Sequence, residues 1–373
     1  MLTAYGLKSH TDSTDNTDFM TLLRLGIGRK ATLPSKTVDW ESVESLAKQQ
    51  GLFAVLFDGV EQLPSALHPP LTTWLRWIGE VQLEEARYNQ QWREACKMAH
   101  LFHQNGIRTY VLKGNVVAEC YSKPEHRVSA DFDCFLLPEK GDADVWEKGN
   151  QLMEEAGYKV GRGFYKNSTF HLPGLTVENH RYMVPFRGNK TLRRLEVLLQ
   201  GMMREIPAQG RNEDARFVGS ELWQPPVMVS ALFLIEHAYS HFLHEGLTWR
   251  HVLDWVMFSQ KHKSEIDWEE FDDRIDEFGF RRFYDAFSQL GQYLIGDVQE
   301  FNSLSVQEKR MLNDIWAPLD LHETLHGVKG KLGLAGNTLR ARWKYRYFSP
   351  ISMPHALWIQ TTGFLFDKNP ALN

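Results

Sequence analysis

Apolar residues recur at helical spacing along most of this chain and alternate with polar residues in only one central stretch. Over the first hundred residues the pattern predicts three helices, which begin near Asp18, Asp39 and Leu71. Asp18 and Asp39 are suited to cap the first two, and Asn105-Gly106 marks the end of the third. From Thr191 the chain is helical again. The remaining helical patterns cover residues 115–121, 142–156, 227–243, 249–261, 268–278, 282–295 and 306–316.

Strand-like alternation is confined to the stretch between residues 108 and 183. Pro173-Gly174 lies between the last two runs and is typical of a hairpin turn. The pattern predicts an α+β fold in which a small mixed-sheet core is flanked by N-terminal and C-terminal helical regions. The strand-like runs are residues 108–112, 131–137, 158–161, 164–172 and 175–183.

Changes in this pattern divide the chain into four regions. Residues 1–17 are rich in Thr, Asp and Ser and are predicted to be a disordered tail, because they cannot bury enough apolar surface to become ordered. Residues 18–106 form the N-terminal helical region, residues 107–188 the α/β core and residues 189–373 the C-terminal helical region.

Composition and charge narrow the classes of function. The 373 residues include 42 Lys and Arg against 47 Asp and Glu, and the net charge of −5 argues against a protein that binds polyanions over its whole surface. Cys96, Cys120 and Cys134 lack CxxC spacing, which argues against a disulfide framework and a zinc site. No apolar run approaches the roughly 20 residues of a membrane span, and no leader pattern opens the sequence. We therefore expect a cytoplasmic protein without a membrane partner.

The strand-like run 131–137 carries two carboxylates, Asp131 and Asp133, spaced i, i+2. Residues with this spacing on a strand point to the same face of the sheet. Glu178 shares a face with His180 by the same rule, on the second strand of the predicted hairpin. Three carboxylates from neighbouring strands would suit Mg²⁺, which prefers oxygen ligands together with substrate phosphates. The alternative is that all three acids lie on solvated strand surfaces.

Positive charge and a glycine turn accompany these acids. Lys113-Gly114 ends the strand-like run before them, and Arg127 lies in the intervening polar loop. Two metal ions held by the acids would activate an attacking hydroxyl and stabilise a departing pyrophosphate in an in-line displacement. The alternative for Lys113 and Arg127 is an ordinary ion pair with a nearby acid.

At these residues the sequence resembles nucleotidyltransferase family 5 of the DNA polymerase beta superfamily. A later string, His237-Ala-Tyr-Ser-His241 followed by Arg250-His-Val-Leu-Asp254, is similar to the helical C-terminal part of that family. The resemblance extends roughly over residues 18–260. The residues that carry its central pattern are Leu112-Lys113-Gly114, Tyr121, Pro124, Arg127, Ser129-Ala-Asp131-Phe-Asp133 and Glu178-x-His180.

The resemblance implies that the protein transfers a nucleoside monophosphate from an NTP to an acceptor. It implies that Asp131, Asp133 and Glu178 are catalytic and bind two Mg²⁺ ions, and that Gly114 opens the turn under the triphosphate. The residues that it implies in nucleotide or phosphate binding are Lys113, Gly114, Asn115, Arg127, Ser129, His180, Arg250 and Asp254.

Several positions depart from the superfamily pattern, among them Phe132 and Cys134, which replace the usual aliphatic residues around the second acid. Gly114 is followed by Asn115, where Gly-Ser or Gly-Gly is usual, so one phosphate-binding hydroxyl is missing. Phosphate binding is then expected to depend on backbone amides at the helix start and on Lys113 and Arg127. Asn179 lies where an apolar residue is more usual.

Two C-terminal segments suggest other ligands. Residues 326–337 are rich in Gly and Lys but lack the GxxxxGK[ST] pattern, so an interhelical linker is a better interpretation than a phosphate loop. Residues 340–348 mix basic and aromatic side chains, which suit a nucleic-acid strand. A helix that lays its cations over an aromatic core explains the same composition.

The sequence thus predicts a Mg²⁺-dependent nucleotidyltransferase whose acceptor, a hydroxyl-bearing small molecule or protein, is not identified. One alternative is a catalytically inactive module of the same fold that binds a nucleotide or a protein. A second alternative, the weaker one, is a nucleic-acid-binding protein that uses the segment 340–348.

Overall fold

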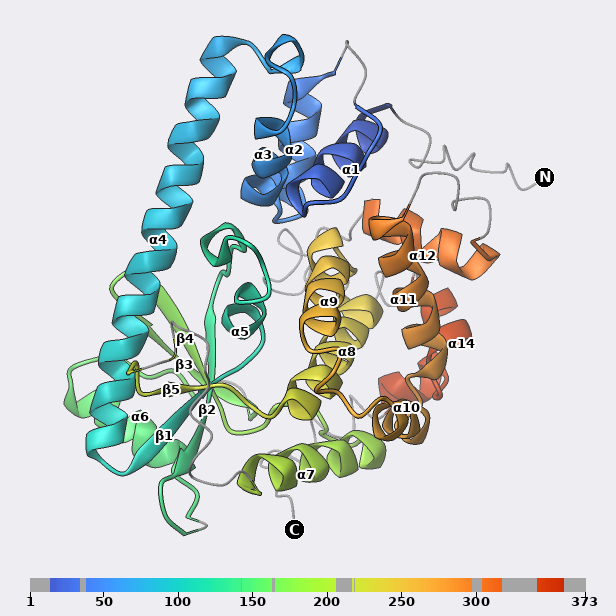
Figure 1. Cartoon of the computed structure of the whole chain (residues 1–373). Helices are drawn as coiled ribbons and strands as arrows, with labels where there is room; N and C mark the ends of the chain where they lie inside the picture. The colour runs from blue at the N-terminus through green and yellow to red at the C-terminus, as the bar shows by residue number, and fades with distance from the viewer. Residues whose placement is uncertain are drawn as a thin grey trace, which may run out of the picture. The chain divides into compact units, whose positions relative to one another are not determined.

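The computed structural model describes residues 14–33, 38–141, 143–162, 165–205, 217, 219–296, 304–316 and 341–358. Within these ranges, the chain forms helices and one five-stranded mixed sheet, so the predicted α+β class is confirmed (Figure 1). Among the helices of these ranges, none is both long enough and apolar enough to cross a membrane.

Hydrophobic periodicity predicted most helices to within a few residues. The helices that agree with it are α2 (Trp40–Gln49), α4 (Leu71–Gln104), α6 (Trp146–Glu155), α7 (Lys190–Arg204), α8 (Val227–His244), α9 (Trp249–Lys261), α10 (Trp268–Glu277), α11 (Arg281–Ile295) and α12 (Val306–Trp316), and α1 (Thr14–Gly26) ends where it was predicted to end. Asp39 caps α2 as predicted, because its carboxylate accepts hydrogen bonds from the backbone N–H groups of Glu41 and Ser42.

Some element predictions differ from the structure. Helix α1 begins at Thr14 rather than Asp18, so only residues 1–13 of the predicted tail remain, and these lie outside the described residues. Helix α3 (Phe53–Glu61) was not predicted, because its uninterrupted apolar sequence FAVLF has no helical period. Helix α5 (Gly114–Ala118) is shorter than the predicted run 115–121.

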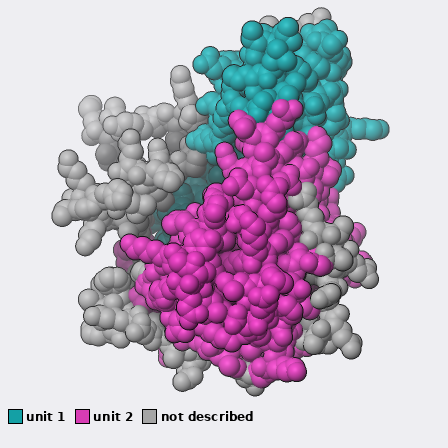
Figure 2. Space-filling view, turned by 90° about the vertical axis from the view of Figure 1, so that its left-hand side faces the viewer, with its two compact units in different colours: residues 1–81, 238–256, 282–348 teal, residues 82–237, 257–281, 349–373 magenta. Residues whose placement is uncertain are grey.

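The described chain forms two compact units, each assembled from separate segments (Figure 2). The first unit comprises Met1–Val81, Ala238–Val256 and Arg282–Phe348. The second comprises Gln82–His237, Met257–Arg281 and Ser349–Asn373, and it contains the sheet.

The first unit packs its N-terminal helices at very short range. Helices α1 and α3 approach through Gly26 and Gly59, and a Cβ built on Gly59 would lie 1.9 Å from the carbonyl oxygen of Leu22. Glu44 of α2 is nearly buried and accepts hydrogen bonds from the Arg76 guanidinium at 2.5 Å and from Trp77 Nε1 at 2.8 Å. These bonds link α2 to α4, and mainly the Arg76 contact lowers the pKa of Glu44 to about 2.

The sheet of the second unit has the strand order β3-β4-β2-β1-β5. Its strands are β1 (Ile107–Val111), β2 (Phe132–Pro138), β3 (Asn167–Leu172), β4 (Leu175–His180) and β5 (Leu222–Trp223). Strands β3 and β4 form the predicted hairpin, and Gly174 adopts the positive φ of +73° that the turn requires. Strand β5 has too few residues to show alternation and was not predicted. The predicted strand 158–161 is reduced to a single bridge between Gly161 and Thr169.

The two faces of the sheet differ in character. Phe132, Cys134 and Leu136 of β2 point to one face and pack against Phe102 of α4 and Met153 of α6 in a buried apolar cluster. Because side chains alternate along a strand, Asp133 points to the opposite face. The hydrophobic pattern of β2 therefore decides that its carboxylate faces away from the main core.

Candidate functional site

Strand register brings the acids of β2 and β4 together. These strands pair in parallel, and Asp133 lies directly opposite Glu178. Directly paired residues share a face of the sheet. Asp133 is 5% exposed, whereas the Glu178 side chain is 29% exposed. The pair therefore has one carboxylate inside the protein and one that is partly exposed to solvent.

Lys113 and His180 both bind the buried carboxylate. Lys113 Nζ lies 2.9 Å from Asp133 Oδ1, and His180 Nε2 lies 2.7 Å from the same oxygen. His180 Nε2 is also 3.3 Å from Glu178 Oε2. The site is thus a compact charge cluster drawn from β2, β4 and the residue that precedes α5.

Electrostatics keep this cluster charged. Burial favours the neutral form of Asp133, but Lys113 and His180 outweigh burial and hold the pKa of Asp133 well below its usual range. Burial also opposes the charge of Lys113, and the carboxylate of Asp133 more than compensates, so the pKa of Lys113 is raised. The hydrogen bond from His180 lowers the pKa of Glu178.

The donor set fits a divalent cation. One ligand atom each from Asp133, Glu178 and His180 lies within 4.8 Å of the others. His180 Nδ1 donates to the Tyr182 carbonyl oxygen at 3.2 Å, which directs Nε2 toward the two carboxylates. A backbone carbonyl on the second ring nitrogen is the usual support of a metal-binding histidine. The two carboxylates suit Mg²⁺ or Mn²⁺, whereas the imidazole nitrogen suits Zn²⁺ and other transition metals better.

Asp131 lies at the edge of this cluster. It precedes the first residue of β2 and is partly exposed. Burial and the negative charge of Asp133 together raise the pKa of Asp131. The closest set therefore contains His180, which the sequence had suggested for the nucleotide, and the assignment of Asp131 as a metal ligand remains a prediction.

Gly114 has a packing role that its sequence position did not reveal. A Cβ at residue 114 would lie 2.5 Å from Arg127 Nη1 and 2.6 Å from Ser129 Oγ. Arg127 is buried, and its Nη1 donates to Ser129 Oγ at 2.6 Å. Lys113 adopts a positive φ of 48°, which costs conformational energy in a residue with a side chain. Gly114, Arg127 and Ser129 thus form one packed turn beside Lys113.

Three other residues were predicted to bind the nucleotide, and the structure shows where each of them lies. Asn115 is buried in α5. Arg250 and Asp254 belong to α9 in the first unit, where Arg250 Nη1 would lie 2.9 Å from a Cβ at Gly51. Their role in binding a nucleotide stays a prediction.

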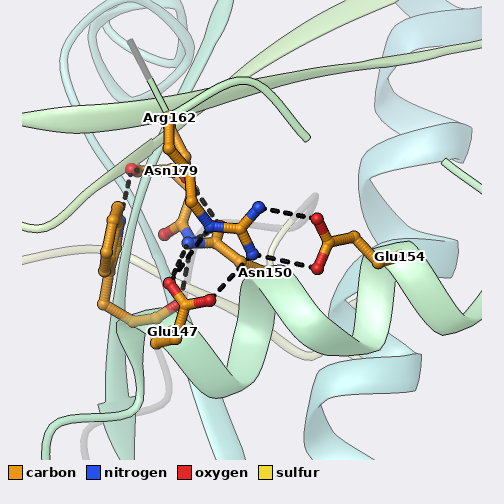
Figure 3. Close-up of polar contacts among 7 residues, drawn as sticks. Glu147, Asn150, Glu154, Arg162 and Asn179 are labelled. Carbon is orange, nitrogen blue, oxygen red and sulfur yellow. Dashed lines mark hydrogen bonds and ion pairs between the residues drawn. The ribbon is translucent and has the colours of Figure 1, made fainter. Parts of the chain in front are cut away.

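Asn179 has a clear structural role on the other face of β4. Its side-chain Nδ2 donates to Asn150 Oδ1 at 2.9 Å (Figure 3). Its backbone carbonyl oxygen accepts from Trp146 Nε1 at 2.9 Å. Ser168 Oγ donates to the same Asn150 oxygen at 2.6 Å. This amide network ties α6 to β3 and β4. Asn179 therefore has a structural role on the face of the sheet opposite Glu178 and His180.

Glu196 of α7 holds the backbone of the segment just after His180 through a hydrogen bond. It is fully buried, and its Oε2 accepts from the Val184 backbone N–H at 2.7 Å. Burial is the main reason that its pKa rises from 4.5 to about 7. The sequence contained no motif that marked this residue.

The titration of Glu196 predicts a pH-dependent stability. Between about pH 4.5 and 7 the folded state binds more protons at this carboxyl than the unfolded state does. Its contribution, about 3 kcal/mol, is therefore full below that window and lost as the pH rises through 7. In denaturant titrations at a series of pH values, Glu196→Gln should flatten the decline in unfolding free energy. The exposed Glu155→Gln should not, and equal slopes for both variants would contradict the assignment.

The basic-aromatic segment is largely packed in the first unit. Helix α14 (Arg342–Phe348) buries Lys344, whose Nζ donates to Asp314 Oδ2 at 2.6 Å and to the Phe242 carbonyl oxygen at 2.8 Å. Tyr345 and Phe348 are buried too, whereas Arg342 and Arg346 are exposed. This arrangement matches the structural alternative for residues 340–348. The Gly- and Lys-rich residues 326–337 lie outside the described residues.

Comparison with known proteins gives one match. A family model described as "uncharacterised nucleotidyltransferase" matches residues 36–296, which is more than half of the chain. Searches of curated proteins and of solved structures found no match.

Proposed function

The chain belongs to this family of uncharacterised nucleotidyltransferases, and from that membership we propose that it transfers a nucleoside monophosphate from an NTP to a hydroxyl-bearing acceptor. In this reaction an acceptor oxygen attacks the α-phosphorus. The bond from that phosphorus to the bridging oxygen breaks, pyrophosphate leaves, and the hydroxyl proton passes to solvent or a nearby base.

One observation supports the proposal most strongly. Asp133 and Glu178 are paired across neighbouring strands, and His180 brings a nitrogen to within 2.7 Å of one acid and 3.3 Å of the other. The cluster brings three carboxylates together, and two of them, Glu178 and Asp131, are partly exposed to solvent. Negative charge on one side and Lys113 on the other suit a metal-bound triphosphate.

Each residue has a distinct role in this proposal. Asp133, Glu178 and His180 hold a divalent cation, with Asp131 beside them. That cation would neutralise charge on the phosphates and on the departing pyrophosphate. Lys113 binds a phosphate oxygen, and its contact with Asp133 fixes its position before the nucleotide arrives. Arg127 and Ser129 hold the turn at Gly114 in shape.

The proposal is tested with the purified full chain and each of the four labelled NTPs. Mg²⁺ and Mn²⁺ are supplied separately, and a cell extract provides acceptors. We expect pyrophosphate release and transfer of label with at least one NTP, dependent on the cation. Nucleotide binding without turnover would instead support the inactive module. Absence of both binding and transfer would reject both interpretations.

A further inference from the structure

Two charged side chains of the second unit lie near the candidate site and have no role in the proposal above. Glu236 of α8 is 2% exposed, and Lys166 lies just before β3. Within the described part of the chain, neither side chain takes part in a hydrogen bond or a close ion pair. Burial of an ionised carboxylate and an ammonium group is costly unless opposite charges lie nearby.

The surrounding elements place Glu236 and Lys166 beside Lys113. The ring of Phe233, in α8, lies 5.8 Å from Lys113 Nζ. Glu236 follows Phe233 by three residues, so both lie on the same side of the helix. Lys166 is next to Asn167, which pairs with His180, and its carbonyl oxygen accepts from the backbone N–H of Arg181 at 2.8 Å. These contacts place the start of β3 and this part of α8 next to the Asp133 cluster.

The charges form an alternating group. The Glu236 carboxylate attracts both Lys166 and Lys113, and it is repelled by Glu196. Lys166 is repelled by Lys113 and attracted by Glu236, Asp133 and Glu178. Burial lowers the pKa of Lys166 and raises that of Glu236 to about 7. Two ammonium groups in one poorly solvated place are unfavourable unless anions accompany them.

We propose that Lys166 and Lys113 together bind the polyphosphate chain of the nucleotide, and that Glu236 is the counter-ion that the incoming phosphates replace. A triphosphate carries several negative charges along a short chain, which matches two neighbouring ammonium groups. The inference rests on the proposed nucleotidyl transfer, but it concerns only the binding of the phosphate chain.

The space around Lys113 limits the direction of entry. A cavity between α5 and α8, bordered by Lys113, Val116 and Phe233, has a volume of about 10 Å³. That volume holds roughly one water molecule. The phosphate chain must therefore approach from the side of Asp131 and Glu178, where the site is open.

Isothermal calorimetry with inorganic tripolyphosphate in the presence of saturating Mg²⁺ tests this inference, because the probe needs neither a base nor turnover and the cation offsets the charge of Asp131, Asp133 and Glu178. We expect Lys166→Met to weaken binding of tripolyphosphate about tenfold or more, through loss of one charged contact. Lys166→Arg should bind nearly as the unaltered protein does. Lys159→Met, which removes an exposed lysine of the same unit, should change nothing.

Glu236→Gln supplies a result of opposite sign. It keeps the shape of the side chain and removes its charge, so at pH 8, above the pKa of about 7 for Glu236, tripolyphosphate should bind several-fold more tightly. Orthophosphate should respond far less than tripolyphosphate to any of these changes, whereas a purely structural role would affect both probes alike. Failure of the unaltered protein to bind tripolyphosphate, or weaker binding by Glu236→Gln, would overturn the inference. Absence of nucleotidyl transfer with binding intact would instead reject only the proposed reaction.

Discussion

Asp133→Asn should reduce the rate of nucleotidyl transfer by about a thousandfold or more, because a divalent cation contributes several kcal/mol to such a transition state. The amide leaves one neutral oxygen where Lys113 and His180 now share a carboxylate oxygen at 2.9 and 2.7 Å. It therefore removes a candidate ligand and also the charge that fixes Lys113. The measurement is the initial rate of pyrophosphate release at saturating NTP.

Two variants separate chemistry from folding in this experiment. Asp133 is buried, so its replacement also threatens stability, and circular dichroism must show that the variant is folded. Glu178→Gln alters a more exposed side chain of the same cluster and should lose activity with less effect on folding. Asp273→Asn, an exposed control, should retain the full rate. Activity of Asp133→Asn within tenfold of the unaltered protein would exclude Asp133 from the reaction.

Gly59→Ala should destabilise the first unit by about 2–3 kcal/mol, although alanine is ordinarily the better helix former. The added Cβ would lie 1.9 Å from the carbonyl oxygen of Leu22 and 2.9 Å from the backbone nitrogen of Gly26. Backbone atoms of a packed helix cannot move aside as the tip of a flexible side chain can. Helices α1 and α3 must then separate, and the apolar contacts between them are lost.

Gly79→Ala is the matched control, since it makes the same change inside α4. Apart from the adjacent residues and the backbone of the same helix turn, no described atom lies within 4 Å of a Cβ at Gly79. That variant should gain about 0.5–1 kcal/mol from reduced backbone freedom in the unfolded chain. Thermal melting and denaturant midpoints should therefore move in opposite directions for the two variants. A Gly59→Ala protein as stable as Gly79→Ala would refute the close helix contact.

Local patterns were sufficient to predict much of the fold. Helix α4 begins and ends where its periodicity places it, and the hairpin of β3 and β4 follows from alternation and a Pro-Gly turn. Alternation also put Asp133 on the face of β2 opposite Phe132 and Cys134, and Glu178 on one face with His180, because the two-residue period of a strand is strict.

Contacts between distant segments explain what the sequence could not reveal. The bond between Lys113 and Asp133 depends on how β1 and β2 pair, and no spacing rule distinguishes a phosphate ligand from a partner of an acid. Glu196 and Glu236 look like any helix surface acid until packing buries them. Helix α3 was missed because helix and strand are indistinguishable in a short apolar run.

The amide network around Asn179 determines which alignment of β4 the protein adopts. A slip of β4 by two residues would keep its apolar side chains on the core face, so hydrophobic burial alone discriminates weakly between the two alignments. Such a slip would move Asn179 away from Asn150 and would leave buried amide groups without partners. It would also carry Glu178 away from Asp133. Polar groups on the face opposite the candidate site thus contribute specificity, by making the alignment that pairs Asp133 with Glu178 the one that folding selects.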